Sequence, residues 1–153
     1  MPVEIVLGAL TADGRTDVPA TRALIGEAGH TPITFHKAFD STRSLQRSLE
    51  SLIELGVIRV LTSGGAATAP EGAKMLKTLT AQSLGAVAIL AGGGVRPSNV
   101  TKLIARTGVG EVHLRAQCEP PTGRHVADRW HPRVSNVAHL DPAHVSVLTE
   151  ARP

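Results

Sequence analysis

The stretch Thr34-Phe35-His36-Lys37-Ala38-Phe39-Asp40 decides the fold, because a short apolar run ends in it and gives way at once to polar residues. Two later runs end in a comparable way, at Leu61-Thr62-Ser63-Gly64-Gly65 and at Ala91-Gly92-Gly93-Gly94-Val95-Arg96-Pro97. Five such runs begin at intervals of 25 to 30 residues, near Val3, Ile33, Ile58, Val87 and Val112. A strand, a polar loop and a helix repeated in this way predict the parallel α/β architecture of a (βα) barrel, whose sites lie at the carboxyl ends of its strands.

Strands and helices can be placed from hydrophobic periodicity and from the residues that end each run. Strands are expected over residues 3–10, 32–39, 57–62, 86–91 and 111–115. Helices are expected from the N-cap Asp17 to Gly29, from Leu45 to Gly56, from about Pro70 onward, and from Pro97 to Gly108. Residues 117–139 show no sustained period and are expected to form a long irregular loop, and residues 141–150 have the pattern of a short final helix.

The length suits one domain, a single partial barrel over residues 1–153. Five strands with four intervening helices are too few to close an eight-stranded barrel, which typically needs ~250 residues. A Rossmann sheet is disfavoured because the first turn lacks the dinucleotide-binding fingerprint. The expected fold is therefore α/β, a TIM-type (βα) barrel fragment with an open side. We expect a homo-oligomer that forms through that side, since the fragment exposes its inner face and two sheet edges.

Composition restricts the partners of the chain. The basic residues behind the net charge of +3 are scattered, and only two Phe and one Trp are present, so a nucleic-acid surface is not predicted. No segment approaches the ~20 apolar residues of a membrane span, and the first residues do not resemble a signal peptide. Cys118 is the only cysteine, which rules out an intramolecular disulfide and fits a reducing compartment. We expect a cytoplasmic protein that binds neither nucleic acid nor membrane.

Alternation along the strands sorts polar side chains onto the inner face of the barrel. This face is expected to carry Thr34, His36, His113 and Arg115, with Glu4 at its base. Imidazole titrates near neutrality, so His36 and His113 are candidate acid and base residues, together with Asp40 at a matching strand end. The alternative interpretation is that each histidine is buried and bonded to a neighbouring carbonyl or hydroxyl group.

Loop residues at the strand ends form a candidate anion site. Gly92, Gly93 and Gly94 allow close backbone approach, and they are followed by Arg96 and by a helix amino terminus near Asn99. The alternative is a tight strand-to-helix turn that binds nothing. Thr62, Ser63 and Gly64 can likewise form either an anion site or a tight turn that binds nothing. No basic residue adjoins them in sequence that could activate a hydroxyl group, so neither Thr62 nor Ser63 is predicted to be a nucleophile.

Metal binding rests on few residues. Cu(I) prefers thiolate and thioether ligands, of which the chain offers only Cys118, Met1 and Met75. The remaining candidates are His36 and His113, because the four histidines of the tail lack a zinc-like spacing.

The segments TFHKAFD, RVLTSGG, AGGGVRPSN and EVH, in this order, resemble the C-terminal portion of the CutC family of copper homeostasis proteins, and VLGALTADGRTD resembles the family's fourth strand and its turn. The resemblance covers about residues 3–115. It implies strands 4–8 of a TIM-type barrel, with strands one to three missing, a cytoplasmic location, and copper as the cofactor. Matching motif positions are occupied by His36, Asp40, Thr62, Ser63, Gly64, Gly92, Gly93, Gly94, Asn99 and His113. The family usually continues His-x-Ser at the last strand, where this chain has Arg115.

Three functional hypotheses follow. The leading one is a CutC-like cytoplasmic protein that acts in copper homeostasis and binds copper. The second is a (βα) barrel enzyme of unknown reaction that binds a phosphorylated or carboxylated small metabolite at the strand ends. The third is an inactive truncated fragment, and translation of the DNA upstream of Met1 would test it.

Overall fold

The computed structural model describes residues 4–115 and 135–139 of the chain. Five parallel strands alternate with four α-helices, which confirms the predicted α/β class. The strands are β1 (Ile5–Leu7), β2 (Ile33–Phe35), β3 (Arg59–Thr62), β4 (Ala88–Gly92), β5 (Glu111–Arg115) and β6 (Ser135–His139). The helices are α1 (Val18–Ala28), α2 (Leu45–Glu54), α3 (Ala73–Ser83) and α4 (Val100–Thr107), with a 3-10 helix η1 (Lys37–Ser41).

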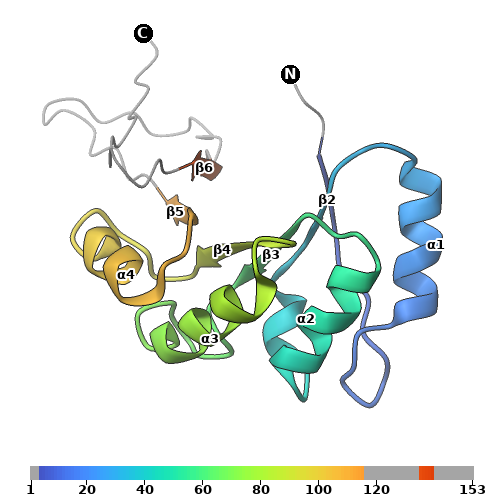
Figure 1. The fold of residues 1–153 in the computed structure, drawn as a ribbon, viewed down its shortest axis with the longest axis horizontal. Coiled ribbons are helices and arrows are strands. Elements are labelled where there is room, and N and C mark those ends of the chain that lie inside the picture. The colour runs from blue at the N-terminus through green and yellow to red at the C-terminus, as the bar shows by residue number, and fades with distance from the viewer. Residues whose placement is uncertain (1–3, 116–134, 140–153) are drawn as a thin grey trace, which may run out of the picture.

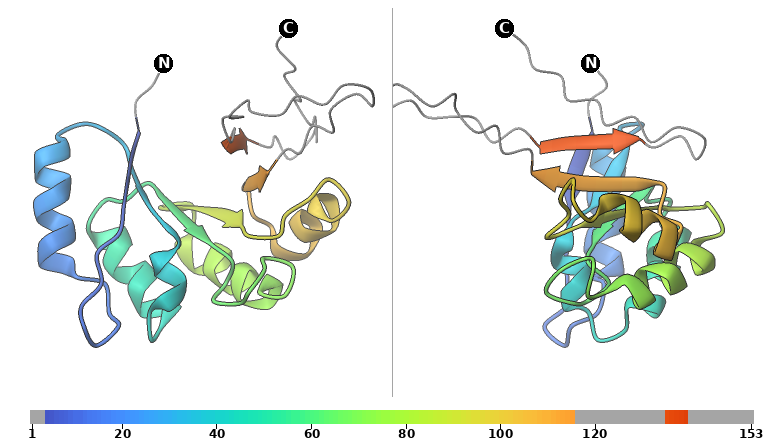
Figure 2. Two further views of the ribbon diagram at one scale, coloured as in Figure 1. Left: turned by 180° about the vertical axis from the view of Figure 1, so that it is seen from behind. Right: turned by 90° about the vertical axis from the view of Figure 1, so that its left-hand side faces the viewer.

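The strands form one sheet in chain order, β1 to β6, and the four helices lie along its outer side (Figures 1 and 2). This order arises because each helix returns the chain to the neighbouring position of the sheet. Strands β1 to β5 are parallel, and β6 is antiparallel to β5. No helix within residues 4–115 has the length and apolar character needed to cross a membrane.

Local signals in the sequence explain where the helices begin and end. Asp17 caps α1 as predicted, since its carboxylate accepts a hydrogen bond from the backbone N–H of Ala20 at 3.0 Å. Ser44 caps α2 through the N–H of Arg47. Gly108 ends α4 with a left-handed φ of 73°, a conformation that costs glycine little.

The structure corrects several predicted boundaries. The second strand was placed over 32–39, but it ends at Phe35, because the His36 ring accepts a hydrogen bond from the N–H of Ala38 and the backbone turns into η1. Pro97 is not the first residue of α4; it lies in a turn that places the first helical residue at Val100. The third helix likewise begins at Ala73 rather than near Pro70.

The predicted loop over 117–139 is wrong for its last five residues, which form β6. They pair with the whole of β5, and Arg115 at the end of β5 faces Ser135 in the register. Such pairing supplies hydrogen bonds to an edge that would otherwise be open. The rest of that loop, 117–134, and the final helix expected over 141–150 lie outside the described residues.

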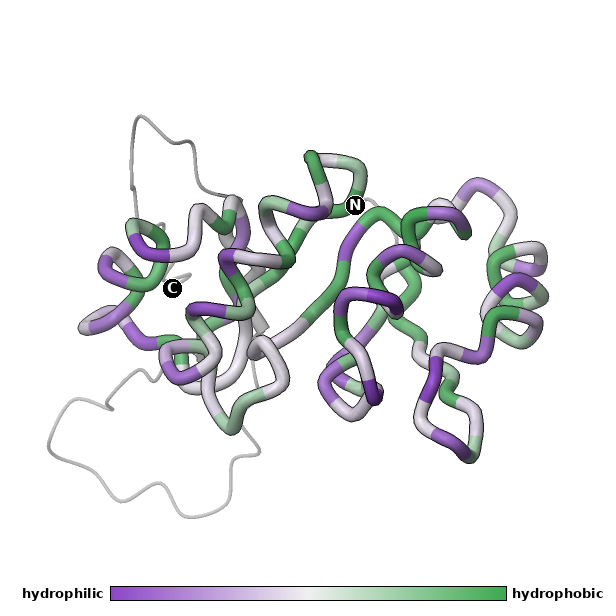
Figure 3. The backbone as a smooth tube through the Cα atoms, turned by 60° about the horizontal axis from the view of Figure 1, so that its bottom comes forward, coloured by the Kyte–Doolittle hydropathy of each residue, from purple (hydrophilic) through white to green (hydrophobic). Residues whose placement is uncertain are grey.

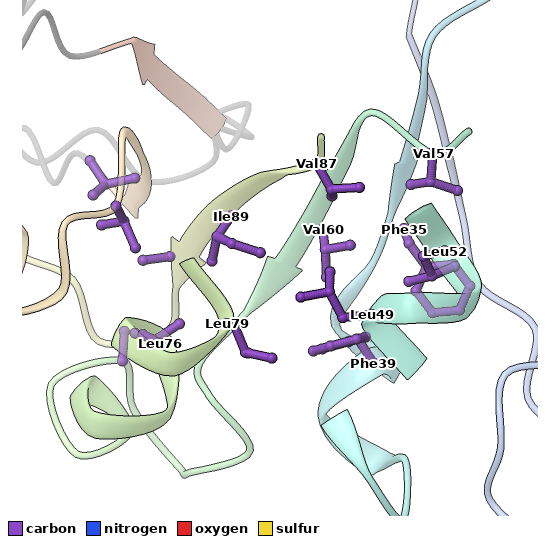
Figure 4. Packing of buried hydrophobic residues seen from close by; sticks show 14 of the residues in the cluster. Phe35, Phe39, Leu49, Leu52, Val57, Val60, Leu76, Leu79, Val87 and Ile89 are labelled. Carbon is purple, nitrogen blue, oxygen red and sulfur yellow. The ribbon is translucent and has the colours of Figure 1, made fainter. Parts of the chain in front are cut away.

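The core lies between the sheet and the helices (Figure 4). Both phenylalanines of the chain are fully buried in it, Phe35 on β2 and Phe39 on η1, against Leu49 and Leu52 of α2. Each helix carries both hydrophobic and hydrophilic residues along its length (Figure 3), as expected for helices that cover one face of a sheet. Apolar side chains therefore anchor the outer face of the sheet and leave the inner face for polar groups.

Sheet register confirms which residues share the inner face. Phe35 is paired with Val60, and both belong to the core, whereas the pair Thr34 and Arg59 points to the opposite face. Val6, paired with Thr34, lies on the same inner face and is 60% exposed.

Candidate functional site

A partly buried ionic network occupies the base of the inner face. The guanidinium group of Arg59 donates to Glu111 at the start of β5, with Nη2 to Oε1 at 3.1 Å, and to Glu4 beside β1. The hydroxyl group of Thr34 donates to Glu4 as well. The hydrogen bond to Glu111 raises the pKa of Arg59 against the opposing effect of burial, and the charges of Glu111 and Glu4 add to the increase. The network lies at the amino ends of the strands, the end that serves stability in (βα) barrels.

Two histidines predicted to face inward lie further along the strands: His36 follows the carboxyl end of β2, and His113, in the middle of β5, is paired with Gly92 at the carboxyl end of β4. Each adjoins a glycine on the neighbouring strand: a Cβ atom at Gly8 would come 2.7 Å from Nε2 of His36, and one at Gly92 would come 3.3 Å from Cβ of His113. Nδ1 of His36 accepts the N–H of Ala38 at 3.0 Å, so the neutral ring carries its proton on Nε2. Because glycine has no side chain, Gly8 and Gly92 leave room for the side chains of His36 and His113.

Asp40, the third predicted acid–base residue, is surrounded by hydrogen-bond donors. One carboxylate oxygen accepts from Lys37 Nζ at 2.8 Å and from the N–H and hydroxyl group of Ser63 at 3.0 Å each; the other accepts from Thr62 Oγ1 and from the N–H of Gly65 at 2.9 Å. Burial acts to raise the pKa of Asp40, but the hydrogen bonds from Lys37, Thr62, Ser63 and Gly65 outweigh it and hold the pKa below its ordinary value. Asp40 is therefore held as an anion.

The Asp40 carboxylate also orders the loop after β3. Its two oxygens bind both strand-end residues Thr62 and Ser63, and the Thr62 hydroxyl in turn accepts the N–H of Gly64 at 2.9 Å. Thr62 and Ser63 are fully buried. Four of the predicted site residues thus lie in one cluster, in which the carboxylate acts as an anchor. An acid–base role for Asp40 stays a prediction.

Lys37 belongs to this cluster and was missed by the sequence analysis. Its Nζ lies 2.6 Å from Ser63 Oγ and 2.8 Å from Asp40, while the side chain stays 43% exposed. A Cβ atom at Gly93 would come 3.4 Å from Cε of Lys37, so the amine borders the glycine-rich loop. The available signal was its position three residues before Asp40, a spacing that lets the two side chains meet on a helical turn.

The glycine-rich loop after β4 is closed by its own hydrogen bonds. Asn99 accepts the N–H of Arg96 and donates to the carbonyl group of Gly94, both at 2.9 Å, and the carbonyl group of Gly93 accepts the N–H of Ala69 at 2.8 Å. These contacts account for Asn99 as a turn residue, and they leave the exposed side chain of Arg96 at the surface. The predicted anion site at this loop stays a prediction.

Metal ligands do not gather in the part of the chain that the structure describes. Residues 4–115 hold no group of three or more His, Cys, Asp or Glu side chains that would suit a metal ion. Met75, the one described sulfur ligand, packs partly buried against the core. Cys118 and Met1 lie outside the described residues, so the donor set described here does not fit a soft copper site.

Comparison with known proteins places the chain in a family. The model of the CutC family matches residues 2–118. A relative named family protein CutC from Chromobacterium violaceum is 47% identical over 113 residues, covering 74% of this chain and 46% of the relative. The protein of the same name from Vibrio vulnificus strain YJ016 is 49% identical over 121 residues, covering 77% and 48%.

A solved structure agrees with these matches. The putative copper homeostasis protein CutC from Streptococcus agalactiae superimposes with a TM-score of 0.65 and 31% identity, covering 68% of this chain and 51% of that one. The chain spans about half the length of the curated relatives it matches. All five parallel strands lie within the matched residues. The chain therefore belongs to the CutC family.

Proposed function

We propose that this chain binds an anionic small molecule at the carboxyl ends of its parallel strands, in a rim site formed by His36, Lys37 and His113. The observation that carries the proposal is the geometry of Lys37, whose ammonium group makes two hydrogen bonds, to Asp40 and Ser63, and is half exposed. An ammonium group has three donors, so one remains for a ligand oxygen.

The neighbouring groups suit the same ligand. His36 presents Nε2–H when neutral, because its Nδ1 is already occupied by the N–H of Ala38. Asp40 neutralises part of the Lys37 charge and also fixes its position, which lowers the entropy lost when a ligand is bound. A carboxylate or phosphate group is the class of ligand that donors of this kind bind.

Thermal unfolding with citrate and with inorganic phosphate tests the proposal. A ligand that binds only the folded state raises the melting temperature by mass action. The increase should be smaller in Lys37→Met than in the unaltered chain and undiminished in Lys102→Met, an exposed lysine on α4. Anions also stabilise folded proteins generally, so the difference between these two variants is the measure. Equal responses in both variants would disprove the rim site.

We also propose that the chain acts in copper homeostasis in the cytoplasm, as a family member and by analogy with the name of the streptococcal relative. Within the described residues no cluster suits Cu(I), so we expect no chelator-resistant copper site built from one copy of the chain. Titration of the full chain with Cu(I) against a competing chelator tests this. Tight stoichiometric binding that survives Cys118→Ser would reveal a histidine or thioether site, and loss of binding would indicate a site shared through Cys118.

A further inference from the structure

A depression lies away from the rim cluster, between the loop after β1 and the amino terminus of α2. Its volume is about 580 Å³, within the range of small-molecule sites. Polar lining comes from Arg15 and Thr16 on one wall and from Arg43, Ser44, Arg47 and Ser48 on the other. The two walls are joined by a hydrogen bond from the N–H of Arg43 to the carbonyl group of Gly14 at 2.8 Å. We call this depression the arginine groove.

The arginine groove has an excess of positive charge. Arg15 pairs with Asp13 at 2.8 Å, and Asp13 is the carboxylate beside the groove. Arg43 and Arg47 form no ion pair with any residue in 4–115, although both line the groove. The amino terminus of the ten-residue helix α2 adds a partial positive charge at the same wall.

We propose that the arginine groove binds the phosphate group of a small phosphorylated molecule. Guanidinium groups of Arg43 and Arg47 bind the phosphate oxygens, for which their planar donor pairs are matched. Phosphate suits the groove better than a single carboxylate, because it offers enough oxygens for two guanidinium groups at once. The groove shares no residue with the proposed rim site.

Binding of inorganic phosphate and of pyrophosphate to the full chain tests the proposal, with calorimetric titration at constant ionic strength. Arg43→Met and Arg47→Met should each weaken binding at least roughly tenfold, since each removes a charge-assisted contact. Arg22→Met, an exposed arginine on α1, should bind as the unaltered chain does. Unchanged affinity in both groove variants would overturn the proposal, as would absence of any binding at about 10 mM phosphate.

Lys37→Met separates the groove from the rim site. This variant should bind phosphate in the groove as tightly as the unaltered chain does, and loss of phosphate binding in it would assign the phosphate to the rim site instead.

Discussion

Asp40→Asn should destabilise the folded chain by about 3 kcal/mol, because an amide can replace only half of the Asp40 carboxylate. The amide oxygen can keep the hydrogen bonds from Thr62 and Gly65, but the amide nitrogen then faces the N–H of Ser63 and the ammonium group of Lys37. Loss of the buried bond from Ser63, with donor now facing donor, costs about 2 kcal/mol. Loss of the half-exposed ion pair with Lys37 costs about 1 kcal/mol at most.

The assay for Asp40→Asn is thermal and urea unfolding at several pH values. For a chain of this size, about 3 kcal/mol corresponds to a drop of roughly 6–12 °C in melting temperature. The folded state lowers the pKa of Asp40, so its carboxylate contributes stability above the unfolded-state pKa, and this contribution is lost as the pH falls through the folded-state pKa. The difference between the unaltered chain and the variant should therefore be constant near neutrality and shrink below about pH 4.

The matched control is Asp13→Asn, at a carboxyl group in an exposed surface pair with Arg15. It should leave the melting temperature nearly unchanged. If Asp40→Asn melts with the unaltered chain, or if the difference between them persists undiminished at acid pH, the carboxylate does not anchor the loop after β3.

Three other predictions concern the sheet, one of them with a control substitution in α1. Arg59→Met takes the guanidinium group from the buried carboxylate of Glu111 and should cost about 3 kcal/mol in urea unfolding; an unchanged midpoint would contradict the ionic network. Gly92→Ala places a Cβ atom 2.5 Å from a neighbouring leucine and should lower the free energy of unfolding by roughly 1–3 kcal/mol. Gly26→Ala, with open space in α1, should raise it by up to about 1 kcal/mol. Equal effects of the two substitutions would refute the steric argument. Val6→Lys charges the exposed inner face and should abolish concentration-dependent association in light scattering; a chain that is already monomeric would disprove that interface.

The alternation of apolar and polar residues was enough to predict the five parallel strands and the inward position of Thr34. It failed after Phe35, because Ala38 and Phe39 continue the apolar run while a hydrogen bond from the N–H of Ala38 to the His36 ring redirects the backbone. Here a local hydrogen bond between a side chain and the backbone determines the conformation, although the hydrophobic pattern is also compatible with a longer strand.

The ionic network was predicted in part. Glu4 and Thr34 were expected inside, but Arg59 was not, although it has the same strand parity as the inward-facing positions. Its partners Glu4 and Glu111 lie 55 and 52 residues away in sequence, so their approach depends on the complete sheet. A charged residue in a short strand is usually solvated, and only the tertiary structure shows that this one is paired.

Arg59 also links three strands of the sheet. Neighbouring strands are about 4.8 Å apart, so β1 and β5 would be separated by about 19 Å in a flat sheet. One guanidinium group, carried by the middle strand β3, contacts the carboxylates of Glu4 beside β1 and of Glu111 on β5, so its two ion pairs span the parallel part of the sheet.

The two candidate histidines lie further along the strands, toward their carboxyl ends. His36 follows β2 and His113 lies on β5, and neither is hydrogen-bonded to Arg59 in the described structure. Arg59 can therefore be replaced without removing a direct contact of either histidine, so any change in ligand binding in Arg59→Met would have to act through the positions of the strands.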